Sequence, residues 1–184
     1  MKTDYRTRRP LSRAATVLAS LLLIAEGTCA ANAEVWRFGE FNIDWPDGYV
    51  RVPKADVIQF VNPNGVGVTV DVLSHRAMSP QLEGEEIQGF RRYAREQLVS
   101  LATRHGNIVI PLHEETLSAG RILFSVADEK QASQFGLIFL LISPHGNIAQ
   151  LVVEGPGAAT EQMSRFRALM ETGRWTGEAA QNPS

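Results

Sequence analysis

The sequence predicts an α+β domain: an antiparallel β-sheet of about six to seven strands with a long helix and a C-terminal helix packed on it. Short apolar runs with a period of two, separated by Gly, Pro, Asn and Asp, predict the strands. Between Gly84 and Arg104 the period changes to three and four residues, which predicts a helix. The order strands, helix, strands, helix favours helices packed on an antiparallel sheet.

The chain before the long helix contains four predicted strands. Trp45-Pro46-Asp47-Gly48 and Asn62-Pro63-Asn64-Gly65 have the composition of turns. The second of these turns leads into a run in which every other residue is valine, so the valines share one face of a strand. The predicted strands are residues 35–44 (interrupted near Gly39), 49–53, 56–62 and 66–73.

The long helix is predicted over residues 84–104. Acidic Glu85 and Glu86 lie in its first turn, and Arg104 and His105 lie at its end before Gly106, an order that the helix dipole favours. The residues expected to form its buried stripe are Ile87, Phe90, Ala94, Leu98 and Leu101.

Four more strands and a second helix follow. Turns are expected at residues 128–131 and 143–146, and the run 135–142 is apolar almost throughout, which predicts a central strand buried on both faces. The second helix begins near Thr160, ends at Gly173 and is followed by Trp175, which we expect to fold back on it. The predicted strands are residues 108–117, 121–127, 135–142 and 148–153, and the stripe of the second helix is Ala159, Met163, Phe166 and Met170.

Residues 1–33 predict a secretory signal peptide. Five basic residues within residues 1–13 precede a 12-residue apolar run, and the segment ends in Ala31-Asn32-Ala33. The apolar run is shorter than the about 20 residues that a membrane-spanning helix needs. We therefore expect cleavage before Glu34, with cleavage after Ala30 as the alternative, and no stable membrane span afterwards.

Cleavage changes the composition of the chain. It removes five of the 18 Lys and Arg, two of the 20 Asp and Glu and the single Cys, which leaves 13 basic against 18 acidic residues, a net charge of −5. An acidic chain is not attracted to nucleic acid, and a chain without Cys excludes thiol chemistry. We expect one domain over residues 34–176 and a polar C-terminal tail over 177–184.

The export route follows from residues 7–11. Thr7-Arg8-Arg9-Pro10-Leu11 resembles a twin-arginine signal in part, but Pro10, Ser12 and Arg13 depart from that pattern. We therefore expect export by the general secretory (Sec) route, to the bacterial periplasm.

Residues 41–49 read Phe-Asn-Ile-Asp-Trp-Pro-Asp-Gly-Tyr. This stretch resembles the F-x-I-x-x-P-x-G-[WY] start of the PsbP-like and DcrB-like exported domains, and the predicted order of elements over residues 35–176 is similar to theirs. The resemblance implies the PsbP-like fold and a non-enzymatic accessory or binding role, since most members of that group are of this kind. The shared motif carries no catalytic residue.

Motifs of common enzyme and metal sites are absent from the sequence. It has no G-x-S-x-G, no H-E-x-x-H and no P-loop, and Gly65-x-Gly67 opens a strand rather than a phosphate-binding helix. In His113-Glu114-Glu115 only His113 and Glu115 share a strand face, which favours a solvated surface over a metal site. We therefore predict no catalytic residue, no metal and no cofactor. A hydrolase site built from Asp44, Asp47 or the histidines is the weakest alternative.

A basic outer side of the long helix is the candidate site. Arg91 and Arg95 are four residues apart, and like charges at this spacing destabilise a helix by a few tenths of a kcal/mol, which calls for a reason. One reason is a docking patch for an acidic partner or headgroup, and the other is a solvated face relieved by Glu96. His75 and Arg76 end a strand in a loop, where function concentrates. The predicted partner-binding residues are Arg91, Arg92, Arg95, His75 and Arg76.

Aromatic residues gather near the start of the mature chain. They could line a ligand cleft, but aromatic residues at strand positions usually belong to the core, which is the interpretation we favour. They are Trp36, Phe38, Phe41 and Trp45.

These observations predict an exported, non-enzymatic accessory or binding protein that docks to another periplasmic or envelope protein. The alternative from another class is a module that binds a small ligand or a metal in a cleft between sheet and helix.

Overall fold

Two antiparallel sheets organise the residues that the structure describes, which are 34–52, 58–74, 80–131 and 133–178 of a computed structural model. The larger sheet has seven strands in the order β3-β4-β5-β9-β8-β7-β6, and the smaller has three in the order β1-β2-β10. The strands are β1 (Glu34–Phe38), β2 (Phe41–Trp45), β3 (Val50–Val52), β4 (Ile58–Val61), β5 (Gly67–Ser74), β6 (Asn107–Thr116), β7 (Ile122–Gln131), β8 (Gln134–Ile142), β9 (Ile148–Pro156) and β10 (Arg174–Trp175).

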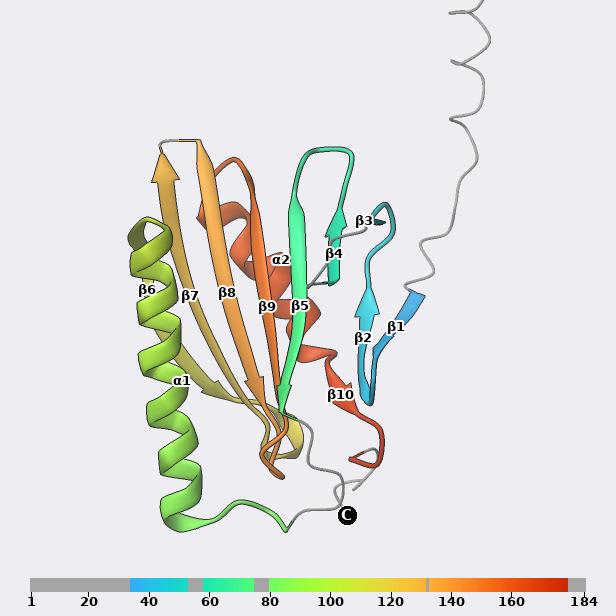
Figure 1. Cartoon of the computed structure of the whole chain (residues 1–184), viewed down its shortest axis with the longest axis vertical. Coiled ribbons are helices and arrows are strands. Elements are labelled where there is room, and N and C mark those ends of the chain that lie inside the picture. Colours follow the sequence, from blue (N-terminus) through green and yellow to red (C-terminus); the bar gives the residue numbers. More distant parts are fainter. Residues whose placement is uncertain (1–33, 53–57, 75–79, 132, 179–184) are drawn as a thin grey trace, which may run out of the picture. The chain divides into compact units, whose positions relative to one another are not determined.

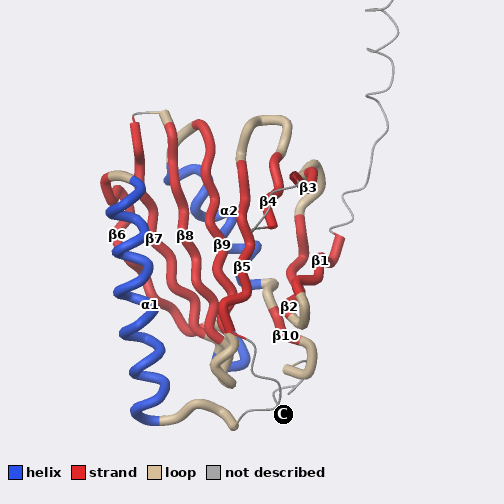
Figure 2. Tube along the Cα trace, in the orientation of Figure 1, coloured by secondary structure: helices blue, strands red, loops and turns tan. Residues whose placement is uncertain are grey.

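Two α-helices cover opposite faces of the larger sheet. Helix α1 (Gly84–His105) packs against β6, β7 and β8, and α2 (Ala159–Glu171) packs against β7 and β8 from the other side. Figure 1 shows α1 in front of the sheet and α2 behind it, and Figure 2 shows the same layers by secondary structure. The predicted stripe of α1 is confirmed, because its members lie in the core between this helix and the sheet. A short 3₁₀ turn, η1 (Ser118–Gly120), joins β6 to β7.

Strand β8 lies at the centre of the core. Every residue from Phe135 to Ile142 is buried, which confirms the predicted central strand. Because side chains alternate along a strand, Leu137 and Phe139 join the core on the α2 side, whereas Ile138 and Leu140 join the core under α1. One strand thus serves two apolar layers.

The small sheet is a feature that the sequence did not predict. Residues 34–45 form a hairpin around Gly39, whose φ of 64° suits glycine, and β10 then pairs with β2 through Trp175 opposite Phe41. The strand interruption near Gly39 is confirmed. The pairing of β10 could not be predicted, because a strand of two residues has no periodic pattern in the sequence. The aromatic residues of this hairpin lie in the core, Trp36 at its margin, as the favoured interpretation held.

The predicted turn at residues 128–131 is wrong, because β7 continues to Gln131. The four residues Asp128-Glu129-Lys130-Gln131 are polar, so they carry no strand periodicity, yet they pair with the start of β8. This extension brings Asp128 and Lys130 to the end of the sheet where α1 finishes.

The predicted signal peptide, residues 1–33, lies outside the described residues, as does the end of the predicted tail, 179–184. Within the described ranges, no helix has both the length and the apolar composition needed to cross a membrane.

Candidate functional site

Glu114 of β6 lies against the predicted arginine patch on α1. Its carboxylate is 3.3 Å from Nε of Arg91 and accepts a 3.0 Å hydrogen bond from Nε of Arg95, together with a second contact from Nη2 of Arg95. One acid thus partners both arginines, which offsets their mutual repulsion within the fold. The Arg95 side chain nevertheless stays 52% exposed.

Arg92 differs from its two neighbours. It is exposed, and no hydrogen bond or ion pair joins it to another residue in the described part of the chain. Arg92, Arg95 and Val99 follow the i, i+3, i+7 spacing of one helix stripe, and Val99 is 39% exposed. Tyr93, 45% exposed, stands beside the stripe. The predicted residues His75 and Arg76 lie outside the described residues.

Neighbouring acids on β6 point to opposite faces of the sheet, as the alternation of a strand requires. Glu114 faces α1, whereas Glu115 accepts hydrogen bonds from Nε (2.6 Å) and Nη2 of Arg167 on α2. The bond from Arg167 holds the pKa of Glu115 below its ordinary value. The two helices are therefore tied to one edge strand by arginine–glutamate pairs.

A second cluster of charged groups lies at the C-terminal end of α1. Glu154 of β9 accepts a 3.1 Å hydrogen bond from Nζ of Lys130, and the same oxygen, Oε1, is 3.3 Å from Nδ1 of His105. Burial alone would raise the pKa of Glu154, but Lys130 and His105 outweigh that effect and lower it. His105, the last residue of α1, is also placed where the helix dipole favours a cation.

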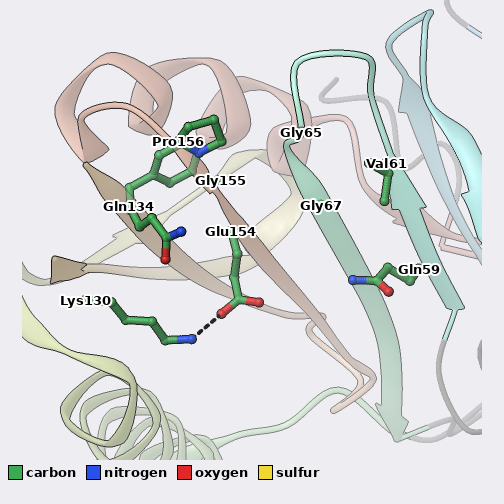
Figure 3. A pocket seen from close by; sticks show the side chains of 10 residues that line it. Gln59, Val61, Gly65, Gly67, Lys130, Gln134, Glu154, Gly155 and Pro156 are labelled. Carbon is green, nitrogen blue, oxygen red and sulfur yellow. Dashed lines mark hydrogen bonds and ion pairs between the residues drawn. The ribbon is translucent and has the colours of Figure 1, made fainter. Parts of the chain in front are cut away.

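The Lys130–Glu154 pair forms one side of a pocket of about 320 Å³ (Figure 3). Polar side chains of four strands reach the pocket, those of Gln59, Lys130, Gln134 and Glu154. Its other lining residues are small or apolar: Val61, Gly65, Gly67, Phe135, Gly155 and Pro156. Among the described residues, α1 meets this site through the contact of His105 with Glu154, and no residue of α1 lines the pocket, so it is not the sheet–helix cleft of our alternative prediction.

Asp128 is buried next to this cluster. The residue is 1% exposed, and neither carboxylate oxygen has a hydrogen-bond partner among the described groups. A Cβ at Gly136, its partner on β8, would lie 2.8 Å from Oδ1, so the carboxylate needs a glycine beneath it. Burial raises the pKa of Asp128, although His105 and Lys130 act in the opposite direction.

Replacing Asp128 with asparagine is expected to stabilise the protein at neutral pH, by roughly 1 kcal/mol, because it removes a buried charge without a partner. A pKa raised by folding means that the native state binds the proton more tightly than the unfolded chain. The destabilisation by wild-type Asp128 is therefore full above the raised pKa, declines as the pH falls below it and is lost below the ordinary value of 3.8. Urea unfolding from pH 8 down to that ordinary value should show the advantage of the variant shrinking on acidification.

Exposed Glu86 provides the control for Asp128. Glu86→Gln should change the free energy of unfolding little at any of these pH values. If the free energy of unfolding of Asp128→Asn differed from that of wild type by the same amount at every pH, or did not differ at all, the buried carboxylate would not be destabilising.

The sequence analysis missed the pocket residues, although two signals for them existed. Gly67 and Gly155 are glycines inside strands, which often mark a place where another group approaches closely. Lys130 belongs to the polar run that we read as a turn. The lining residues lie on five strands, β4, β5, β7, β8 and β9, and on the turn at Gly65, and no local pattern in the sequence predicts that they meet.

No metal centre is found: across the described ranges, no three His, Cys, Asp or Glu residues are grouped so that they could hold an ion. The acids named as hydrolase candidates are also separated. Asp44 is 3.2 Å from Nη2 of Arg174, and Asp47 is exposed in a turn.

No protein-family model and no curated protein matches this chain in sequence. Its structure is similar to the solution structure of cyanobacterial PsbP (CyanoP) from Synechocystis sp. PCC 6803, with a TM-score of 0.50 and 10% identity over 83% of this chain and 99% of that one. It also matches the crystal structure of the Ran-binding protein Mog1p from Saccharomyces cerevisiae, with a TM-score of 0.48 and 11% identity over 79% of this chain and 96% of that one. The fold is PsbP-like, as residues 41–49 implied.

Proposed function

We propose that this protein is exported to the periplasm and works there as a non-enzymatic accessory protein, which docks to an acidic surface of another envelope protein. The exposed face of α1 carries the proposal. Arg92, Arg95 and Val99 form one stripe with Tyr93 beside it, and arginine, tyrosine and exposed apolar groups are the residues that protein interfaces favour. We name these four residues the α1 surface.

The partner's charge follows from the arrangement of the arginines. Glu114 holds the Arg95 guanidinium in place, so less side-chain entropy is lost when a partner binds it. Arg92 adds a cation that no described residue neutralises. On a mature chain of net charge −5, Arg91, Arg92 and Arg95 against Glu96 and Glu114 leave this side of α1 with one positive charge in excess, which would steer an acidic partner. An extension of the surface to His75 and Arg76 stays a prediction.

The PsbP-like fold agrees with the binding role that the motif of residues 41–49 implied. Export is supported by the sequence of residues 1–33, in which a basic segment and a 12-residue apolar run precede Ala31-Asn32-Ala33.

The export part of the proposal predicts a processed chain in the periplasm. Protein recovered from the periplasmic fraction should begin at Glu34, because Ala31-Asn32-Ala33 is the better cleavage site. Mass spectrometry of the intact protein measures this directly. Full-length chain confined to the cytoplasm would contradict export, and loss of export in an Arg8→Lys, Arg9→Lys variant would replace the Sec route by the twin-arginine route.

The docking part predicts that Arg92→Glu weakens partner binding at least tenfold, since it places an acid in the path of an acidic surface. Arg92 is a sharper choice than Arg91 or Arg95, because reversing either of those would place a second acid beside Glu114 and disturb the fold. The partner is first identified by crosslinking in intact cells and mass spectrometry. It is then purified, and its dissociation constant is measured at several salt concentrations.

The matched control is Arg37→Glu on β1, another exposed arginine with no ion pair among the described residues. A stoichiometric partner that is retained by the Arg37 variant and lost by the Arg92 variant supports the α1 surface. Equal binding by both variants would discard that surface. Recovery of the protein alone from its own envelope would refute the accessory role.

A further inference from the structure

The pocket beside Glu154 is built from pairs of hydrogen-bond donors and acceptors. The carboxamides of Gln59 and Gln134 each offer one donor group and one acceptor, and Lys130 and Glu154 together offer the same combination. Figure 3 shows these four side chains around one space, each from a different strand. These side chains suit a ligand whose polar groups both donate and accept hydrogen bonds.

Glu154 keeps one oxygen free for a ligand. Lys130 and His105 both contact Oε1, and no residue in the described ranges donates to Oε2. These two contacts also fix the direction of the carboxylate, so the acceptor is already oriented before anything binds. Lys130 uses one donor on Glu154 and retains others for the ligand.

Glycines keep the pocket open. A Cβ at Gly67 would lie 3.5 Å from Nε2 of Gln59, so any side chain there would occupy the space between this amide and Glu154. Gly155 and Gly65 contribute backbone to the lining, and Val61 and Pro156 provide apolar walls. A ligand in this space would meet backbone and apolar carbon on one side and the four polar side chains on the other.

The charges of the pocket favour an uncharged ligand. Lys130 and Glu154, each about half exposed, lie 3.1 Å apart and neutralise each other, so an uncharged molecule can bind both without separating them. Hydroxyl groups on neighbouring carbons each donate and accept, so a polyhydroxylated molecule can engage all three donor–acceptor pairs, whereas one amide group engages only one pair. We propose that this pocket binds a saccharide through an uncharged hexose unit. The inference does not depend on docking by the α1 surface.

The test is a titration of the ¹⁵N-labelled protein with D-glucose, D-galactose and D-mannose, followed by NMR. At least one hexose should shift the side-chain amide signals of Gln59 and Gln134 and the backbone amides of Gly67 and Gly155, with a dissociation constant in the millimolar range. Gln59→Ala combined with Gln134→Ala should weaken that binding at least tenfold. Gln150→Ala is the matched control, because Gln150 lies on β9 on the same face as Glu154 but does not line the pocket.

Three outcomes would overturn the proposal. The first is that none of the three hexoses shifts the pocket signals at 100 mM. The second is that only glycylglycine or glucuronate shifts them, which would assign the pocket to an amide or to an anion. The third is that Gln150→Ala weakens binding as much as the double variant, which would place the hexose elsewhere on the sheet.

Discussion

Replacing Trp45 with alanine is expected to lower the free energy of unfolding by about 3–5 kcal/mol, the usual loss for a large buried aromatic side chain. Trp45 is 1% exposed, and its ring lies 5.3 Å from Trp36, 5.1 Å from Phe60 and 5.7 Å from Tyr49, measured between ring centroids. Trp45 belongs to the small sheet and Phe60 to the large one, so the ring joins the two sheets. Urea unfolding followed by circular dichroism measures the loss.

Two further variants define the origin of this effect. Trp45→Phe should lose clearly less, because it keeps an aromatic ring and removes an indole N–H that is buried without a partner among the described residues. Trp36→Ala should also lose less, since Trp36 is only partly buried. A Trp36 variant as unstable as the Trp45 variant would show that the contact between the sheets lies elsewhere.

Gly106→Ala is expected to destabilise the protein by about 3 kcal/mol, the upper part of the range for forcing atoms into a packed core. Its φ of −175° is extended backbone, so the reason is space and not conformation. A Cβ would lie 2.4 Å from the carbonyl oxygen of Glu129 and 2.9 Å from the backbone nitrogen of Lys130. Backbone atoms of a paired strand cannot move aside as a side chain can, so the end of α1 would be pushed away from β7.

Gly89→Ala is the matched control within the same helix. A Cβ at Gly89 meets nothing within 4 Å, and alanine is favoured over glycine inside a helix by about 1 kcal/mol, so this variant should be more stable than wild type. The two Gly→Ala substitutions are therefore expected to have opposite signs in one unfolding assay. Equal stability of the Gly106 variant and wild type would contradict the close approach of α1 to β7.

Local patterns in the sequence predict most of the fold. The stripe of α1 repeats over many residues and the run of β8 is apolar almost throughout, and each prediction is confirmed. The motif at residues 41–49 also indicated the PsbP-like fold correctly. What local patterns could not predict depends on contacts between distant residues, such as β10 pairing with β2 and the extension of β7 through Asp128.

The candidate site divides in the same way. Arg91, Arg92 and Arg95 could be found from their spacing, but Glu114, which partners two of them, comes from the next element of the chain. The pocket is a stronger example, because Gln59, Gln134 and Glu154 become neighbours only when four strands have paired. Sequence spacing reveals a helix surface, whereas a site on a sheet exists only in the assembled structure.

The pairing of β10 with β2 has a consequence for the order of folding. Asn42 and Thr176, which are hydrogen-bonded beside this pair, are 134 residues apart in the chain. The meander β7-β8-β9 can form as soon as its own residues have been made. The small sheet cannot form until β10 has been made, and closing so long a loop is slow. During synthesis, Phe41 therefore stays without its Trp175 partner until residue 175 has been made. A domain whose first and last strands pair in this way stays incompletely folded until both segments are present.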